Sequence, residues 1–187
     1  VLSIEKRSRK QQPPVPFNTT SLMTAASAEG LSPARTMRLA ESLYMDGYIS
    51  YPRVDNTVYP SSLDLEEVVK TISGNPAYAP FCKELLAKGP LTATRGKKET
   101  TDHPPIYPTA MVTPDDLPPA EYKLYNLIAR RFLATLSEAA VVEGTKVTLD
   151  ISGEHFTAKG DVLVHEGYRT IYPYGMKKDE QLPALAE

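Results

Sequence analysis

The strongest constraint on the fold is a change in hydrophobic periodicity near residue 140. Before it, apolar residues recur at helical spacing. After it, three segments alternate apolar and polar residues: 145–151, 155–159 and, less regularly, 162–164. Such alternation is typical of half-buried β-strands, and Gly153 and Gly160 are predicted to lie in the turns between them. Gly167–Tyr172 is predicted to form a further strand. The chain therefore combines a mainly helical segment with a β segment, an α+β arrangement.

The helical segment contains five predicted helix starts. They lie near Thr19, Ser32, Ser61, Asn75 or Pro76, and Pro119. The helix after Ser32 has the clearest signals, because serine is a favoured N-cap and Pro33 suits the first helical position. An apolar face follows at helical spacing: Met37, Ala40, Leu43 and Tyr44. Gly47 suits the left-handed conformation that often ends a helix.

Tyr51, Arg53 and Asp55 follow this helix at every second residue. In an extended segment alternate side chains share one face, so the three can converge on one object. A tyrosine hydroxyl can attack phosphorus, and a guanidinium can hold phosphate oxygens with two parallel hydrogen bonds. The segment therefore indicates phosphate chemistry, with Tyr51 as the nucleophile. The plainer interpretation is a packed strand tyrosine beside a surface ion pair of Arg53 with Asp55.

The segment Gly-Tyr-Ile-Ser-Tyr-Pro-Arg-Val-Asp-Asn at 47–56 resembles the cleavage motif of type IA DNA topoisomerases. Three further segments match the family in the same order along the chain: Phe17–Leu22, His103–Thr109 and Tyr122–Phe132. Val54 and Asn56 replace the common Thr and Ser of the motif. Pro52 and the His-Pro-Pro-Ile sequence are similar to the archaeal topoisomerase I, topoisomerase III and reverse gyrase branches rather than to bacterial topoisomerase I.

The resemblance implies a helical, winged-helix-like (CAP-like) tyrosine domain that is inserted between strands of a β-rich arch. Residues 1–16 would be the incoming arch strand and linker, 17–139 the tyrosine domain, and 140–187 the returning arch strands. The proline-rich stretch 13–16 and the junction 139–144 would then act as hinges between the two parts.

The resemblance also implies a transesterification that changes DNA supercoiling. Tyr51 would attack a phosphodiester of single-stranded DNA and keep a 5′-phosphotyrosine, until the free 3′-hydroxyl reverses the reaction. Arg53 would stabilise the developing phosphate charge, His103 would contact the phosphate or relay a proton, and Asp55 would orient these groups. The plainer interpretations are a loop histidine with a structural hydrogen bond for His103 and a helix cap for Asp55.

The charge of the chain gives a weaker signal for DNA. A formal net charge of −2 argues against binding through overall positive charge. A basic cluster nevertheless precedes His103, formed by Arg95, Lys97 and Lys98, and we expect it to contact DNA. A solvated loop is the plainer interpretation of this cluster.

The sequence shows no metal-binding carboxylate cluster and no Cys/His zinc pattern, so we expect no metal in this chain. Type IA enzymes are implied to bind Mg²⁺ through a Toprim domain, whose glutamate and Asp-x-Asp motif we do not find here. The chain thus resembles a central fragment that is inactive in relaxation alone. Its expected partners are single-stranded DNA, the Toprim domain and the remaining domains of the parent.

Composition gives an expected location. No run is long and apolar enough to cross a membrane, and the single Cys82 fits a reducing compartment. With the motif variants, these observations predict a cytoplasmic, nucleoid-associated prokaryotic protein of archaeal type.

Two other classes of protein remain open at this point. A winged-helix DNA-binding module without chemistry would explain the helices, and a structural domain that docks a partner would explain the β segment. Neither requires a tyrosine hydroxyl at position 51, so Tyr51→Phe distinguishes both from an enzyme.

Overall fold

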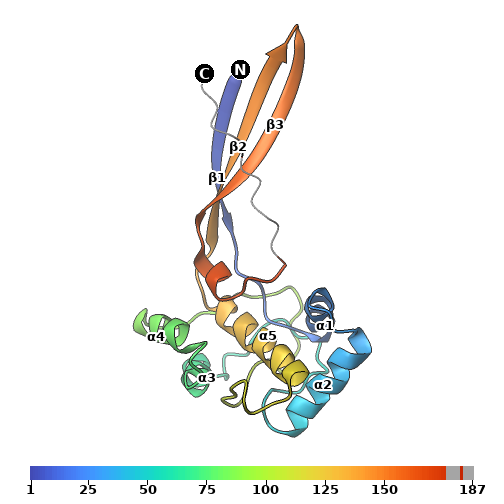
Figure 1. The fold of residues 1–187 in the computed structure, drawn as a ribbon. Coiled ribbons are helices and arrows are strands. Elements are labelled where there is room, and N and C mark those ends of the chain that lie inside the picture. The colour runs from blue at the N-terminus through green and yellow to red at the C-terminus, as the bar shows by residue number, and fades with distance from the viewer. Residues whose placement is uncertain (176–181, 183–187) are drawn as a thin grey trace.

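The computed structural model, described for residues 1–175 and 182, shows a group of helices from which a long three-stranded antiparallel sheet extends (Figure 1). The strand order is β1–β2–β3, and the strands span Ser3–Gln11, Ala140–Ile151 and Glu154–His165. Gln11 pairs with Ala140, although the helices α1 to α5 lie between them in the sequence. The helical segment therefore leaves and rejoins the sheet at the same end.

The helices are α1 (Thr19–Ala28), α2 (Pro33–Met45), α3 (Leu65–Ile72), α4 (Ala79–Ala87) and α5 (Pro119–Thr135), and a short 3₁₀ helix, η1 (Gly167–Thr170), follows β3. Helix α5 lies at the centre of the core, where Leu124, Phe132 and Leu133 are fully buried. Helices α1 and α2 pack against it. Removal of these apolar side chains from water is the main force that holds the helical part together.

Three of the predicted helix starts are confirmed. Helix α1 begins after Asn18, whose side chain accepts a hydrogen bond from the Ser21 N–H, while the Ser21 hydroxyl accepts one from the Asn18 N–H. This reciprocal pair is a capping box. Helix α2 begins after Ser32, and α5 begins at Pro119.

The two remaining helix starts were predicted too early. Helix α3 begins at Leu65 rather than near Ser61, because the Asp64 carboxylate caps the Glu67 N–H at 3.0 Å. Helix α4 begins at Ala79, and Asn75 instead uses its buried side chain to hold the preceding turn. Several polar residues before α3 could each serve as its cap, whereas α4 begins after Tyr78 without a side-chain cap.

Two predictions in the β segment are wrong. Strand β3 runs without a turn through Gly160, which pairs with Thr145. Gly167–Tyr172 is not a strand, because η1 occupies most of it and the Tyr168 N–H donates to the Glu138 carbonyl. Burial of Ile171 in the helical core favours this turn over a fourth strand. Most of the predicted arch segment beyond 175 lies outside the described residues.

The two faces of the sheet differ in polarity. Paired residues share a face, and the pairs Ile4–Val147, Val147–Ala158 and Leu149–Phe156 make one face apolar. The opposite face carries charged and polar pairs such as Glu5–Lys146. On the apolar face Phe156 is 52% exposed. The sheet is therefore amphipathic but provides little buried core of its own.

Candidate functional site

Tyr51 lies in the segment that leaves α2. Gly47 ends the helix with φ of 81°, a left-handed conformation that glycine adopts without strain. The half-buried ring of Tyr51 lies 4.7 Å from the ring of His103, centroid to centroid. Tyr44 contacts it edge-on at 5.3 Å and is 41% exposed, so Tyr44 is not part of the buried helix face as predicted. The predicted nucleophile and the predicted histidine are thus neighbours.

Burial alternates along the segment after Tyr51. Arg53 and Asp55 are exposed, whereas the residues between and after them face the core. These buried residues are Pro52, Val54 and Asn56. The alternation expected of an extended segment is therefore present, and it turns Tyr51, Arg53 and Asp55 away from the core.

Arg53 and Asp55 do not pair with each other, so the plainer interpretation, an ion pair between them, is wrong. The Arg53 guanidinium contacts Glu41 of α2, with Nη2 2.5 Å and Nε 2.7 Å from Oε1. Asp55 accepts hydrogen bonds from Lys98 Nζ at 3.0 Å to each oxygen and from Asn18 Nδ2 at 3.3 Å. A phosphate that bound Arg53 or Lys98 would therefore have to compete with the carboxylate of Glu41 or of Asp55.

Two hydroxyl side chains hold the backbone on either side of Tyr51. The Thr19 hydroxyl donates to the Pro52 carbonyl at 2.6 Å and accepts from the Val54 N–H at 2.9 Å. The Ser50 hydroxyl accepts from the Tyr107 N–H at 2.9 Å, and the Ser50 N–H donates to the Tyr107 carbonyl at 3.0 Å. Segments far apart in the sequence are thereby tied to the Tyr51 backbone.

The basic cluster lies on a loop that packs closely against Thr57. The Gly96 N–H donates to the Thr57 carbonyl at 2.9 Å, and the Thr57 N–H donates to the Lys98 carbonyl at 2.8 Å. A Cβ atom on Gly96 would lie 2.1 Å from the Thr57 hydroxyl, so only glycine allows this approach. The loop brings Lys98 to Asp55, whereas Arg95 pairs with Glu99 and Lys97 is exposed.

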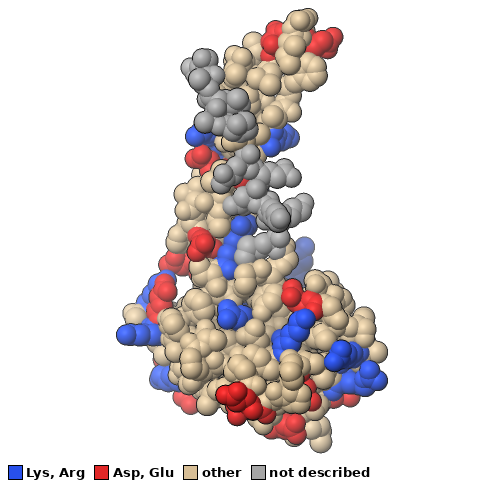
Figure 2. Space-filling model, in the orientation of Figure 1, with Lys and Arg blue, Asp and Glu red and all other residues tan. Residues whose placement is uncertain are grey.

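A groove of about 550 Å³ adjoins this loop at the start of α1. It is lined by Asn18, Thr20, Ser21, Thr24, Ala25, Lys98 and Arg131. On the face drawn in Figure 2, Lys and Arg side chains are interspersed with Asp and Glu over the described residues. The groove itself combines basic and hydroxyl side chains, which suit a phosphate chain.

The donor groups near Tyr51 do not fit a metal ion. Within residues 1–175 and 182, no three His, Cys, Asp or Glu side chains cluster as ligands would. Glu41 and Asp55 are each already paired with a cation.

No helix within residues 1–175 and 182 is long and apolar enough to span a membrane.

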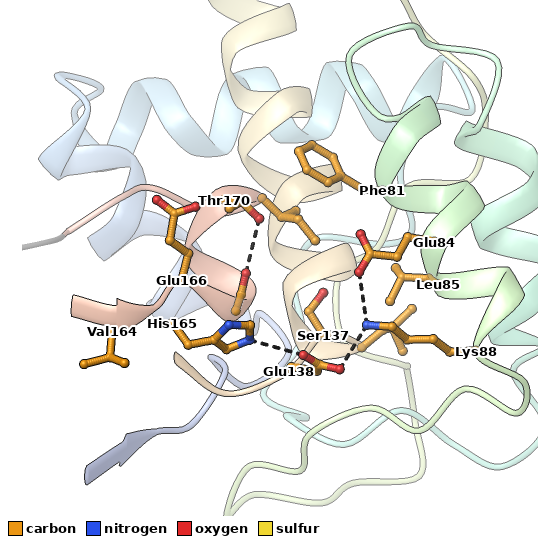
Figure 3. A pocket seen from close by; sticks show the side chains of 13 residues that line it. Phe81, Glu84, Leu85, Lys88, Ser137, Glu138, Val164, His165, Glu166 and Thr170 are labelled. Atoms are coloured by element: carbon orange, nitrogen blue, oxygen red, sulfur yellow. Dashed lines mark hydrogen bonds and ion pairs between the residues drawn. The ribbon is translucent and has the colours of Figure 1, made fainter. Parts of the chain in front are cut away.

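A second cleft, of about 430 Å³, lies at the joint between the helical part and the sheet (Figure 3). Lys88 Nζ of α4 lies 3.0 Å from Glu138 and 3.1 Å from Glu84, and His165 Nε2 lies 3.3 Å from Glu138. The hydrogen bond from Lys88 holds the pKa of the Glu138 carboxyl below its usual value, with a further contribution from His165. These contacts connect the end of α4 to β3 through Glu138, which lies three residues after α5.

Comparison with known proteins assigns the chain to a family. The family model described as DNA topoisomerase matches residues 1–187. The chain belongs to the type IA DNA topoisomerases.

Proteins similar to this chain occur in both archaea and eukaryotes. DNA topoisomerase 1 of Archaeoglobus fulgidus is 43% identical over 180 residues, which are 96% of this chain and 27% of that protein. DNA topoisomerase 3-alpha of Homo sapiens is 34% identical over 188 residues, covering all of this chain and 19% of that protein. Archaeal origin therefore stays a prediction.

A solved structure supports the fold. Full-length topoisomerase I from Thermotoga maritima aligns with 99% of this chain and 31% of its own, at a TM-score of 0.71 and 24% identity. The curated relatives are also much longer than this topoisomerase chain, which spans between 18% and 27% of their length. The chain thus corresponds to a minor part of each of these proteins.

Sequence reasoning missed three residues of the site. Nothing in the spacing of Glu41 indicates Arg53 as its partner. For Gly96 the glycine itself was the available signal, because a glycine often marks the close approach of two backbones. Asn56 was noted as a departure from the common serine, and that departure was the available signal.

Proposed function

We propose that this chain carries the cleavage tyrosine of a type IA DNA topoisomerase, which breaks and rejoins one DNA strand. The observation that carries the proposal is the contact of Tyr51 with His103 on a backbone held by Thr19 and Ser50. Rigid support favours a reacting group because it holds the attacking atom in one geometry. Arg53 lies two residues on, on the same exposed side.

The proposed reaction is a transesterification. The Tyr51 phenolic oxygen forms a bond to phosphorus while the bond from phosphorus to the 3′ oxygen breaks. The phenolic proton is lost and the departing 3′ oxygen gains one, so the protein keeps the 5′ phosphate as a phosphodiester. The 3′-hydroxyl reverses these steps without an external energy source. A phenol must lose its proton as it attacks phosphorus, and His103 is the imidazole in contact with Tyr51.

Arg53 would stabilise the charge that develops on the phosphate oxygens. Its guanidinium lies on the surface, with 56% of the side chain exposed, and it contacts Glu41. A phosphate at Tyr51 would compete with Glu41 for these donors. Asp55, held by Lys98 and Asn18, would act indirectly by fixing the basic loop.

The groove at the start of α1 is the proposed path of the single strand. Hydroxyl and amide groups of Asn18, Thr20 and Ser21 line it together with Lys98 and Arg131. Such groups bind phosphates without reading the bases. Arg95 and Lys97 on the same loop would contact the backbone further along the strand.

The rest of the proposed enzyme lies in the parent protein. Residues 17–139 would form its winged-helix-like tyrosine domain, and 1–16 and 140–187 would belong to its β-rich arch. A Toprim domain of the parent would bind Mg²⁺ for rejoining and relaxation. Because no donor set near Tyr51 fits a metal, no step above is assigned to one.

Covalent trapping tests the proposal. The parent protein is mixed with single-stranded DNA labelled at its 3′ end, denatured, and examined for labelled protein. We expect an adduct that disappears in Tyr51→Phe, which loses only one hydroxyl, while binding of the strand is retained. Tyr48→Phe, three residues away, is the matched control and should retain the adduct. An adduct that persists in Tyr51→Phe would overturn the assignment, and no adduct from the parent would favour the non-catalytic DNA-binding module.

A further inference from the structure

The buried side chain of Asn56 ties two parts of the site together. Asn56 is 2% exposed, and its Nδ2 donates to the Thr100 carbonyl at 3.0 Å and to the His103 carbonyl at 3.1 Å. Its Oδ1 accepts from the Val58 N–H at 2.9 Å. The amide thus bridges the segment that carries Tyr51 and the loop that carries His103.

His103 depends on this loop for its place beside Tyr51. Its ring contacts Tyr51 and makes no side-chain hydrogen bond within the described residues. The loop is also held locally, because the Asp102 carboxylate accepts from the Thr100 hydroxyl and from the His103 N–H, which lowers the pKa of Asp102. These bonds shape the turn, but they do not connect it to the segment of Tyr51.

We propose that Asn56 is a positioning residue that sets the His103 ring against Tyr51 through the loop backbone. This inference rests on the proposed function. Asn56 is buried beneath the exposed side of its segment and touches no reacting group; it acts through the two carbonyls. Loss of both donors would take this partner from two part-buried carbonyls and free the loop to move away.

The chain offers a matched control in Asn75. That side chain is 1% exposed, its Nδ2 donates to the Val112 carbonyl at 2.8 Å and to the Tyr122 hydroxyl at 3.1 Å, and its Oδ1 accepts from the Ala77 N–H at 2.9 Å. Asn56 and Asn75 thus make the same kinds of bond at two places in the helical part. Substitution of either by alanine should lower the melting temperature to a similar degree.

Asn56→Ser distinguishes the local bond to Val58 from the two bonds to the His103 loop. A serine hydroxyl can still accept from the Val58 N–H, as asparagine does in such turns. It is too short to reach the carbonyls of Thr100 and His103 together. If the two bonds to the carbonyls of Thr100 and His103 matter rather than the bond from the Val58 N–H, Asn56→Ser should cleave as slowly as Asn56→Ala. It should, however, lose less thermal stability than Asn56→Ala.

The experiment measures single-turnover cleavage by the parent protein at saturating DNA. We expect Asn56→Ala to slow cleavage by roughly tenfold to a hundredfold, because small displacements of a reacting group have effects of this size, whereas Asn75→Ala should leave the rate unchanged. His103→Ala should remove the effect, so that the double variant cleaves no more slowly than His103→Ala alone. The inference is overturned if Asn56→Ala matches Asn75→Ala, or if the two effects multiply.

A second measurement does not depend on cleavage. The Cε1–H signal of His103, observed by NMR in protein with labelled histidine, should carry a ring-current shift from Tyr51. The shift should diminish in Asn56→Ala and persist in Asn75→Ala. If the wild-type parent forms no adduct, the proposed function fails, and this signal still decides whether Asn56 places His103; an unchanged shift in Asn56→Ala overturns that placement.

Discussion

The helical part of this chain buries its apolar side chains far more completely than the sheet does. The helices enclose large side chains completely, as at Phe17, Tyr125 and Phe132. The sheet pairs its backbone over three long strands, yet Ile151 and Phe156 remain more than half exposed. Hydrogen bonds between strands satisfy the backbone, but they supply little of the apolar burial that stabilises a fold. Stability should therefore reside in the helical part.

The proposed site follows the same division. Tyr51, Arg53 and His103 are all held by segments of the helical part, through contacts with Thr19, Ser50 and Asn56. The sheet meets this body at the joint formed by Lys88, Glu138 and His165. The proposed site thus lies wholly on the helical part, and the sheet extends away from it (Figure 1).

The largest expected contrast is between two phenylalanines. Phe132→Ala in α5 should cost about 3–5 kcal/mol of unfolding free energy, because the fully buried ring leaves a cavity. Phe156→Ala in β3, where the ring is 52% exposed, should cost less than about 1 kcal/mol. Urea unfolding of the 187-residue chain, followed by circular dichroism at a helical wavelength, measures both. Equal costs would break the contrast between body and extension.

An effect of intermediate size is expected from alanine substitution of two glycines, one in the helical part and one in the sheet. Gly96→Ala should cost about 1–3 kcal/mol, because its new Cβ would lie 2.1 Å from the Thr57 hydroxyl and 2.4 Å from the Thr57 Cβ. The Cβ of Gly144→Ala in β2 would lie 3.1 Å from the end of the Asp161 side chain and at ordinary contact distance from Arg7 and Arg9, so the change should cost less than about 0.5 kcal/mol. The same unfolding measurement applies. In the parent, Gly96→Ala should also weaken binding of single-stranded DNA, since it displaces Lys98.

The smallest expected effect concerns the joint. The lowered pKa of Glu138 means that its ion pair with Lys88 stabilises the fold above the ordinary carboxyl pKa, and that this contribution is lost as the pH falls through the lowered value. Both side chains are largely exposed, so Glu138→Gln should cost well under about 1 kcal/mol at neutral pH. Urea midpoints of wild type and variant should converge as the pH falls from about 6 to about 3, where the wild-type carboxyl also becomes neutral. A difference that is independent of pH would show that the ion pair contributes nothing.

The sequence by itself determined the local structure and the family. The capped start of α2, the left-handed Gly47 and the outward alternation of Tyr51, Arg53 and Asp55 all follow from neighbouring residues, because capping and side-chain periodicity are short-range effects. The change of period near residue 140 likewise predicted where helices give way to strands. The four ordered motifs were enough to indicate the topoisomerase family, which the comparisons show.

Only the tertiary structure decided which groups meet. Glu41 and not Asp55 contacts Arg53, Asn56 ties the His103 loop to the segment of Tyr51, and Ile171 is buried in the helical core rather than placed in a strand. Each of these contacts joins two different segments of the chain. Such contacts depend on how the helices pack around α5, and no local pattern encodes that packing.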